Sequence, residues 1–206
     1  MEKKMIKNVI FDLGNVLVSF DRDRIIKAFT DREEEKRHLF DRCFLSDKWV
    51  KLDLGDITPE DAAAAVNAGA GRFPRLTEEF FAGWYKKDLP HADAFAIAAE
   101  VKKKGYGIYV LSNMQAAAAD YFRSEGLFDI FDGVVISAYE HMKKPDPRIF
   151  RVLLDRYRLD PRECLFVDDD DTGKSFETAR SLGIRGRAVK PNDTGDIKAM
   201  LSEYGI

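Results

Sequence analysis

Residues 9–17 of the chain read VIFDLGNVL, in which a short apolar run leads directly into Asp12. Three further apolar runs end in the same way, in small, polar or acidic residues. They are residues 108–111 before Ser112 and Asn113, residues 134–136 before Ser137, and residues 165–167 before Asp168. Runs that are continuously apolar, rather than alternating, are typical of strands buried on both faces of a parallel sheet.

Segments with the apolar spacing of helices lie between these runs, over residues 95–104, 116–122, 149–157 and 176–182. A strand, a helix and a further strand repeated in this way form right-handed βαβ crossovers. The expected fold class is therefore α/β, a doubly wound, Rossmann-like parallel sheet.

The stretch from residue 20 to residue 89 breaks this rhythm, because it is rich in helix formers and has no clear strand. Helices are expected over residues 22–40, 59–68 and 77–86, with Thr58 and Thr77 as helix caps. Trp49 and Trp84 are expected either to form the core of this stretch or to line a substrate pocket. We therefore expect an α/β core of residues 1–19 and 90–206, with a small helical cap of residues 20–89 inserted after the first strand.

The composition excludes several classes of protein. With 206 residues, of which 45% are hydrophobic and 33% charged, the chain is not expected to be fibrous, disordered or a disulfide scaffold. A formal net charge of -3 with scattered basic residues argues against a nucleic acid partner. No apolar stretch is long enough for a signal peptide or a membrane span.

The two cysteines, Cys43 and Cys164, lie far apart and belong to no cluster with metal-ligand spacing. We therefore expect a reduced, cytoplasmic setting. The chain is expected to be a monomer or a weak homodimer.

Polar residues at the strand ends form a candidate active site, because ligands bind an open parallel sheet beyond the carboxyl ends of its strands. The residues that follow such ends are Asp12, Ser112, Asn113, Asp168 and Asp169. A single aspartate at a strand end usually forms a turn or caps a helix. Three polar strand ends on one edge, together with Lys144, are a much more specific pattern.

Phosphoryl transfer explains why these residue types belong together. A carboxylate nucleophile must approach a phosphorus surrounded by negative oxygens, so it needs countercharge. Mg²⁺ prefers oxygen ligands, and Asp12 with the pair Asp168 and Asp169 would suit it. Lys144 is expected to add a compact positive charge. Hydrogen bonds to the phosphoryl oxygens are expected from Ser112 and from the backbone of Asn113.

Four stretches resemble, in order and spacing, the signature motifs of the haloacid dehalogenase-like hydrolase superfamily: VIFDLGNVL at 9–17, VLSN at 110–113, KKPDPRIF at 143–150 and LFVDD at 165–169. The resemblance spans the chain from the first strand to the last βα unit. It implies a phosphatase in which Asp12 forms an aspartyl-phosphate. The other implied roles are charge neutralisation by Lys144, phosphoryl binding by Ser112 and Asn113, and Mg²⁺ binding by Asp12, the Gly14 carbonyl, Asp168 and Asp169.

One position departs from the family pattern. Most phosphatases of the superfamily carry an acid/base aspartate two residues after the nucleophile, and here that residue is Gly14. The form with glycine is similar to a subgroup of small sugar-phosphate phosphatases resembling bacterial α-glucose-1-phosphatase. Three substitutes for the missing group are considered. Asn15 could contact the substrate and position water through its amide, Asp21 could fold back over the site, or the substrate itself could supply the group. Asp21 is better explained as a cap or a surface charge of the helix that begins near residue 22.

A second departure is the run of four aspartates at 168–171. Counting forward from Pro161 assigns the metal-binding pair to Asp168 and Asp169, whereas counting back from Gly183 assigns it to Asp170 and Asp171. The first pair is preferred because it follows the apolar strand directly.

The leading hypothesis is an Mg²⁺-dependent phosphatase of a small phosphorylated metabolite, such as a sugar phosphate. A haloacid dehalogenase and a phosphomutase of the same fold are alternatives within the enzymes. From a different class, a relative that binds a phosphate compound or a partner without turnover would explain Gly14.

Overall fold

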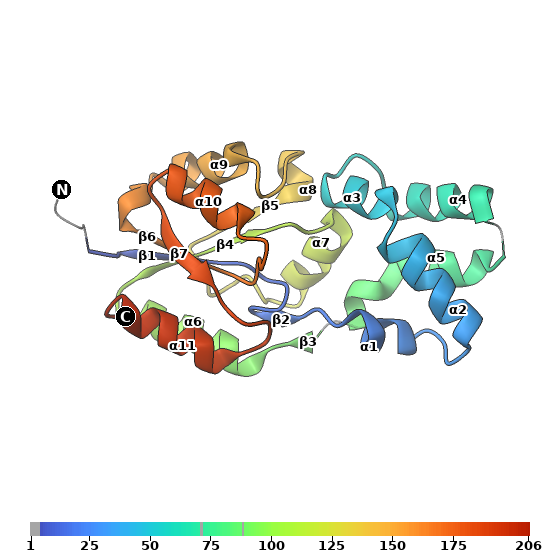
Figure 1. The fold of residues 1–206 in the computed structure, drawn as a ribbon, viewed down its shortest axis with the longest axis horizontal. Coiled ribbons are helices and arrows are strands. Elements are labelled where there is room, and N and C mark those ends of the chain that lie inside the picture. Colours follow the sequence, from blue (N-terminus) through green and yellow to red (C-terminus); the bar gives the residue numbers. More distant parts are fainter. Residues whose placement is uncertain (1–4, 71, 88) are drawn as a thin grey trace.

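The computed structural model describes residues 5–70, 72–87 and 89–206, and it is built around a five-stranded parallel sheet (Figure 1). The strand order is β5-β4-β1-β6-β7. The strands are β1 (Asn8–Phe11), β4 (Gly107–Ser112), β5 (Gly133–Ile136), β6 (Cys164–Asp168) and β7 (Arg185–Ala188). The expected α/β class is confirmed, and the four apolar runs form β1, β4, β5 and β6.

Successive residues of the central strands point to opposite faces of the sheet, and both faces are buried. Val9 and Phe11 of β1 lie in one apolar cluster, whereas Ile10 lies in the other. In β6, Val167 joins the first cluster and Phe166 the second. This two-sided burial explains why these strands are continuously apolar in sequence.

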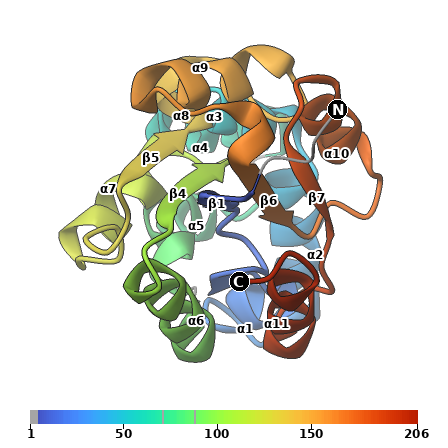
Figure 2. The same ribbon diagram turned by 90° about the vertical axis from the view of Figure 1, so that its left-hand side faces the viewer.

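Helices cover both faces (Figure 2). The first cluster is completed by residues of α6 (Ala92–Lys103), α7 (Ala116–Ser124) and α11 (Thr194–Glu203). The second is completed by α9 (Pro147–Tyr157) and α10 (Lys174–Ser181). The short α8 (Ser137–Glu140) follows β5, and the 3-10 turn η3 (Pro161–Glu163) precedes β6. The predicted core helices therefore exist, with ends shifted by a few residues.

The strand order places a switch point at β1. From β1 the chain builds outward through β4 to β5, and it then returns to add β6 and β7 on the other side. Ligands of open α/β sheets bind at the carboxyl ends of strands at such a point. The fold therefore directs attention to the residues that follow β1, β4 and β6.

Helices fill the segment between the short strands β2 (Val18–Ser19) and β3 (Leu89–Pro90), which pair with each other antiparallel. We call Arg22–Lys87 the helical insertion; it extends away from the sheet in Figure 1. Its elements are α1 (Arg22–Lys27), α2 (Glu33–His38), η1 (Leu39–Phe44), α3 (Asp47–Asp53), α4 (Pro59–Ala70), α5 (Pro74–Gly83) and η2 (Trp84–Lys87).

The prediction of a single helix over residues 22–40 is wrong. The chain leaves the helix after α1, and the Thr30 hydroxyl accepts a hydrogen bond from the backbone N–H of Arg32 at 3.1 Å. Threonine favours such local bonds over a helical conformation, so two helices form instead of one. Helix α3 was also missed.

Of the two predicted helix caps, Thr58 is confirmed and Thr77 is wrong. Thr58 Oγ1 accepts a hydrogen bond from the backbone N–H of Asp61 at 3.2 Å at the start of α4. Helix α5 begins earlier, at Pro74, which suits a first helical position. Thr77 thus lies inside α5, where its hydroxyl donates to the backbone oxygen of Phe73 at 3.0 Å.

Within the described residues, no helix has the length and apolar character needed to cross a bilayer. Both cysteines are buried free thiols.

Candidate active site

The carboxyl ends of β1, β4 and β6 bring three polar residues together, as the sequence predicts. Asp12 follows β1, and its backbone N–H donates to the oxygen of Val167 at 2.8 Å, which extends the pairing with β6. Ser112 and Asp168 are the last residues of β4 and β6. All three are buried, with 8%, 2% and 3% of their surface exposed for Asp12, Ser112 and Asp168.

A carboxylate cluster forms at this edge. Oxygen atoms of Asp12, Asp168 and Asp169 all lie within 4.8 Å of one another. The Nζ atom of buried Lys144 lies 2.9 Å from Oδ1 of Asp12 and 2.5 Å from Oδ2 of Asp168. One ammonium therefore faces three carboxyl groups, so the cluster keeps an excess of negative charge when all three are ionised.

The protonation of these groups reflects this imbalance. Burial, reinforced by the charge of Asp168, raises the pKa of Asp12 to about 6 in spite of Lys144. Burial also raises the pKa of Asp169. Burial opposes the charge on Lys144, but the carboxylates of Asp12 and Asp168 outweigh it and raise the pKa of that ammonium. Lys144 is therefore charged throughout the neutral pH range. Its single positive charge does not balance the negative charge of three ionised carboxylates.

The donor set fits a hard divalent cation. Three carboxylates with converging oxygens and no cysteine or histidine match the preference of Mg²⁺ for oxygen ligands. The excess negative charge, which Lys144 alone does not balance, is the feature that a cation would neutralise.

Asn15 and Gly14 lie in the turn after Asp12. Asn15 adopts a φ of +56°, and its side-chain Nδ2 donates to Oδ2 of Asp169 at 3.0 Å. Its Oδ1 accepts from the backbone N–H of Phe20 at 3.2 Å. The Asn15 amide thus orients Asp169. A Cβ atom added to Gly14 would lie 3.9 Å from Cβ of Phe20, so this position is not closed to a side chain.

The four consecutive aspartates have separate positions. Asp170 Oδ2 accepts a hydrogen bond from the backbone N–H of Ser175 at 2.7 Å, and Oδ1 accepts from the Thr172 hydroxyl at 2.6 Å. These bonds outweigh partial burial and lower the pKa of Asp170. Asp171 is exposed. Asp170 therefore holds the loop before α10, while Asp168 and Asp169 are the pair that meets Asp12.

A cavity of about 110 Å³ adjoins the cluster. Its polar lining comes from Asp12, Asp53, Ser112, Asn113 and Gln115. Its apolar lining comes from Val18, Phe20, Trp49, Trp84 and Met114. Residues of the sheet edge and of the helical insertion thus enclose one space. It is well below the roughly 300–1,000 Å³ of sites for drug-sized ligands, so it suits a small substrate.

Comparison with known proteins decides the family. A model for haloacid dehalogenase-like hydrolases matches residues 6–174. The chain belongs to the haloacid dehalogenase-like hydrolase family. The hydrolase is 31% identical to a D-ribitol-5-phosphate phosphatase of Bacteroides thetaiotaomicron, over 96% of this chain and 98% of the relative.

Solved structures agree on the fold. A haloacid dehalogenase family enzyme of Bacteroides thetaiotaomicron in complex with magnesium and inorganic phosphate is 24% identical, with a TM-score of 0.76, over 91% of the hydrolase and 96% of that chain. L-2-haloacid dehalogenase from Xanthobacter autotrophicus is 21% identical, with a TM-score of 0.66, over 98% and 84% of the two chains. The predicted family, fold and enzyme class, a phosphatase, are confirmed.

Two polar cavity residues, Asp53 and Gln115, were not predicted from the sequence. Asp53 ends α3 in the helical insertion, and Gln115 precedes α7. Gln115 is 1% exposed; its Oε1 accepts from the indole N–H of Trp84 at 3.0 Å, and its Nε2 has no partner among the described residues. Gln115 lies two residues after the VLSN motif, which is the only sequence signal for it. Trp49 and Trp84 line the cavity, and their ring centroids lie 4.7 Å apart.

The sequence candidate Asp21 has a different role. Its Oδ1 accepts a hydrogen bond from the backbone N–H of Arg24 at 3.0 Å, so Asp21 caps α1.

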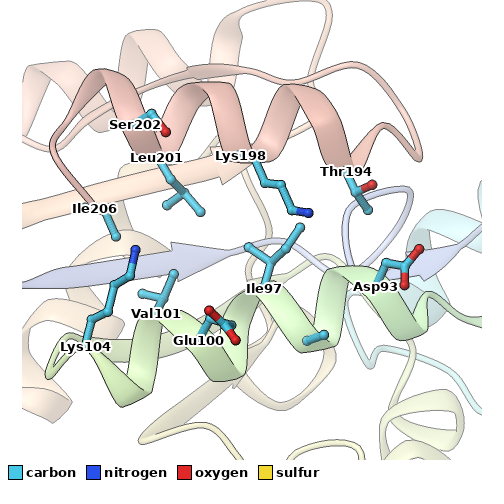
Figure 3. A pocket seen from close by; sticks show the side chains of 11 residues that line it. Asp93, Ile97, Glu100, Val101, Lys104, Thr194, Lys198, Leu201, Ser202 and Ile206 are labelled. Atoms are coloured by element: carbon cyan, nitrogen blue, oxygen red, sulfur yellow. The ribbon is translucent and has the colours of Figure 1, made fainter.

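A larger hollow of about 660 Å³ lies away from this site, between α6 and α11 (Figure 3). Ile97 and Val101 of α6 face Leu201 of α11 across it, and Lys104 and Lys198 border it. None of the residues predicted to act in catalysis lines it. The candidate active site is therefore distinguished by the convergence of strand ends and not by the size of its cavity.

Proposed function

We propose that the hydrolase is a magnesium-dependent phosphatase of small phosphate monoesters, with Asp12 as covalent nucleophile. The observation that carries this proposal is the approach of Lys144 to both Asp12 and Asp168 at the edge of a small cavity. A lysine shared by two buried carboxylates is expected where an anionic nucleophile must meet an anionic substrate.

In this proposal, the phosphoryl group binds beside Ser112, whose hydroxyl donates to a phosphoryl oxygen together with the backbone N–H of Asn113. A carboxylate oxygen of Asp12 attacks phosphorus, and the bond from phosphorus to the leaving oxygen breaks. Water then attacks the aspartyl-phosphate, which releases phosphate and restores the carboxylate. Lys144 neutralises charge on Asp12 and on the phosphoryl oxygens throughout.

The residues that would hold Mg²⁺ are Asp12, Asp168, Asp169 and the carbonyl of Gly14. Mg²⁺ bound there would reduce the repulsion between the carboxylate and the phosphoryl oxygens. We propose that Asn15 affects substrate binding only indirectly, by orienting Asp169, because its amide donates a hydrogen bond to that carboxylate.

We propose that residues 20–89 act as a cap over a core of residues 1–19 and 90–206. Phe20, Trp49 and Trp84 supply apolar walls to the cavity, which would exclude bulk water from the reaction. A small cavity with aromatic walls and a Gln115 Nε2 that lacks a partner among the described residues suits a sugar or sugar-alcohol phosphate, and the D-ribitol-5-phosphate phosphatase relative supports this class. A cytoplasmic location and a monomer or weak homodimer stay predictions.

The test is hydrolysis of 4-nitrophenyl phosphate and of a panel of sugar and sugar-alcohol phosphates by the purified chain. Activity should require Mg²⁺, disappear with a chelator and be lost in Asp12→Asn. Full turnover in the presence of a chelator, or in Asp12→Asn, would contradict the proposal.

A further inference from the structure

Because position 14 is a glycine, the proposed reaction lacks the usual proton donor for the leaving group. The cavity contains a carboxyl group, that of Asp53, which has no part in the steps proposed above. Asp53 lines the same cavity as Asp12 and Ser112. It belongs to the helical insertion, and only 8% of its surface is exposed. A carboxyl that is buried beside a reactive site needs a reason, because burial penalises its charged form.

The backbone of Asp53 is fixed to the core. Its carbonyl oxygen accepts a hydrogen bond from the Ser137 hydroxyl at 2.5 Å, and Oγ of Ser137 accepts from the backbone N–H of Met114 at 2.9 Å. Met114 belongs to the loop after β4 that also carries Ser112. One buried hydroxyl thus connects the end of α3 with the proposed phosphoryl-binding loop.

Two further contacts hold the turn after Asp53. The backbone oxygen of Leu54 contacts Nδ1 of His141 at 3.0 Å. Gly55 has a φ of +69°, and a Cβ atom there would lie 2.1 Å from the backbone oxygen of Ala138. The insertion approaches α8 so closely that only glycine fits at position 55, which fixes the backbone beside Asp53 against the core.

The Asp53 carboxyl itself is not committed to the fold. Among the described residues nothing donates a hydrogen bond to it, and its one ionic neighbour is Lys143, whose Nζ lies 3.9 Å from Oδ2. Burial raises the pKa of Asp53 to about 7, against the opposing charge of Lys143. Near neutral pH the group therefore exists in both protonated and ionised forms.

We propose that Asp53 is the general acid and base of this phosphatase, supplied by the insertion in place of the aspartate that Gly14 lacks. This role rests on the function proposed above. The other candidates are less suited: Asp21 caps α1, Asp170 holds the loop before α10, and the Asn15 amide has no proton to transfer at neutral pH.

The proton balance closes over one turnover. In the first step Asp12 attacks phosphorus, the bond to the leaving oxygen breaks, and protonated Asp53 gives its proton to that oxygen, so that an alcohol departs. In the second step ionised Asp53 takes a proton from water as the water oxygen attacks phosphorus and the bond to Asp12 breaks. Phosphate leaves, and Asp53 is protonated again.

The first experiment compares two esters in Asp53→Asn with Mg²⁺ present. An alkyl phosphate such as glycerol phosphate needs its leaving oxygen protonated, whereas 4-nitrophenolate leaves without help. The rate of phosphoenzyme formation should fall by about 10²–10⁴-fold for the alkyl ester and change little for the aryl ester. Asp56→Asn, at an exposed carboxyl three residues away, is the matched control and should keep the wild-type rates.

The second experiment follows 4-nitrophenyl phosphate over the first turnover. With the base removed, Asp53→Asn should release one equivalent of nitrophenolate per active site rapidly and then turn over slowly, because the aspartyl-phosphate accumulates. Wild type should show no such burst.

The third experiment is a rescue. Since a Cβ at Gly14 meets only Cβ of Phe20, at 3.9 Å, the backbone there has room for the Cβ of an aspartate, and Gly14→Asp restores the family's usual carboxyl. Adding it to Asp53→Asn should recover turnover of the alkyl ester and abolish the burst.

Failure of this inference is distinct from failure of the proposed function. Wild type without Mg²⁺-dependent turnover would overturn the phosphatase assignment. An active wild type in which Asp53→Asn retains both rates, or loses both equally without a burst while the variant is still folded, would overturn the role of Asp53 alone. If Asp53→Asn unfolds, Asp53→Glu should keep the ester selectivity of wild type, and a Glu variant without it would overturn the role.

Discussion

Asn113 and Lys144 exchange two hydrogen bonds: Nδ2 of Asn113 donates to the Lys144 oxygen at 3.0 Å, and the Lys144 N–H donates to Oδ1 of Asn113 at 2.8 Å. One side chain therefore clamps the backbone of a residue from another loop. The clamp holds the Lys144 ammonium between Asp12 and Asp168, which links the second and third sequence motifs.

Replacing Asn113 by alanine should break this clamp. The loss of two partly buried hydrogen bonds should cost about 1–3 kcal/mol of unfolding free energy. Displacement of Lys144 should lower kcat/KM by about 10²-fold, because small errors in the placement of charged groups are costly in catalysis. Urea unfolding and steady-state kinetics measure the two effects. Unchanged kinetics in a destabilised variant would show that Lys144 does not depend on Asn113.

Lys144→Met should remove activity and also destabilise the fold. The variant leaves Asp12 and Asp168 buried without their countercharge, which should cost about 3–5 kcal/mol near neutral pH. Mg²⁺ should restore part of this stability in the variant, since the carboxylate cluster would hold the cation without the lysine. A thermal unfolding temperature that does not respond to Mg²⁺ would argue against a metal site at these carboxylates.

Gly55→Ala should separate the insertion from α8. A positive φ costs an alanine about 1–2 kcal/mol, and its Cβ would also meet the Ala138 oxygen at 2.1 Å. Gly105→Ala is the matched control, because Gly105 has a φ of +90° and no atom within 4 Å of the added Cβ. Both variants should lose stability, but only Gly55→Ala should also lose kcat/KM. Equal kinetics in the two would mean that this contact does not position Asp53.

Asp53→Asn should change how stability depends on pH. Burial raises the pKa of Asp53 from 3.8 to about 7, so the folded state binds a proton that the unfolded state releases. The stabilisation from Asp53 is present below pH 4 and is lost as pH rises through about 7. Relative to wild type, the variant should therefore gain up to about 4 kcal/mol between pH 4 and pH 8.

Denaturant unfolding of both proteins in metal-free buffer across this range measures the difference. Lys143 is the cation that opposes the shift, and Lys143→Met should widen the pH range over which stability is lost. A difference between wild type and Asp53→Asn that does not vary with pH would contradict a buried, protonated Asp53.

The sequence predicts the sheet well because two-sided burial makes β1, β4, β5 and β6 continuously apolar. Strand β7 escapes this rule, since its residues Arg185–Ala188 read RGRA and all four are only partly buried. The insertion was predicted as helical, but its helix ends depend on local side-chain bonds such as that of Thr30, which apolar spacing does not reveal.

The strand-end residues were predictable for a similar reason, because topology alone brings them to one edge. Asp53 was not, because its burial arises from the docking of α3 on α8 through Ser137 and Gly55. In sequence it is one of many acidic residues on a helix. Asp53 and Ser137 are 84 residues apart in sequence, so their contact depends on the tertiary structure and has no local sequence signal.

The most direct measurement is the identification of the phosphorylated residue after rapid acid quench. Asp53→Asn mixed with 4-nitrophenyl phosphate and Mg²⁺, quenched and digested, should yield one peptide that carries a single phosphoryl group, and fragmentation should locate it on Asp12. The same treatment of Asp12→Asn should yield none. A phosphoryl group on another residue, or rapid turnover of wild type with no phosphorylated peptide in any variant, would contradict Asp12 as the nucleophile.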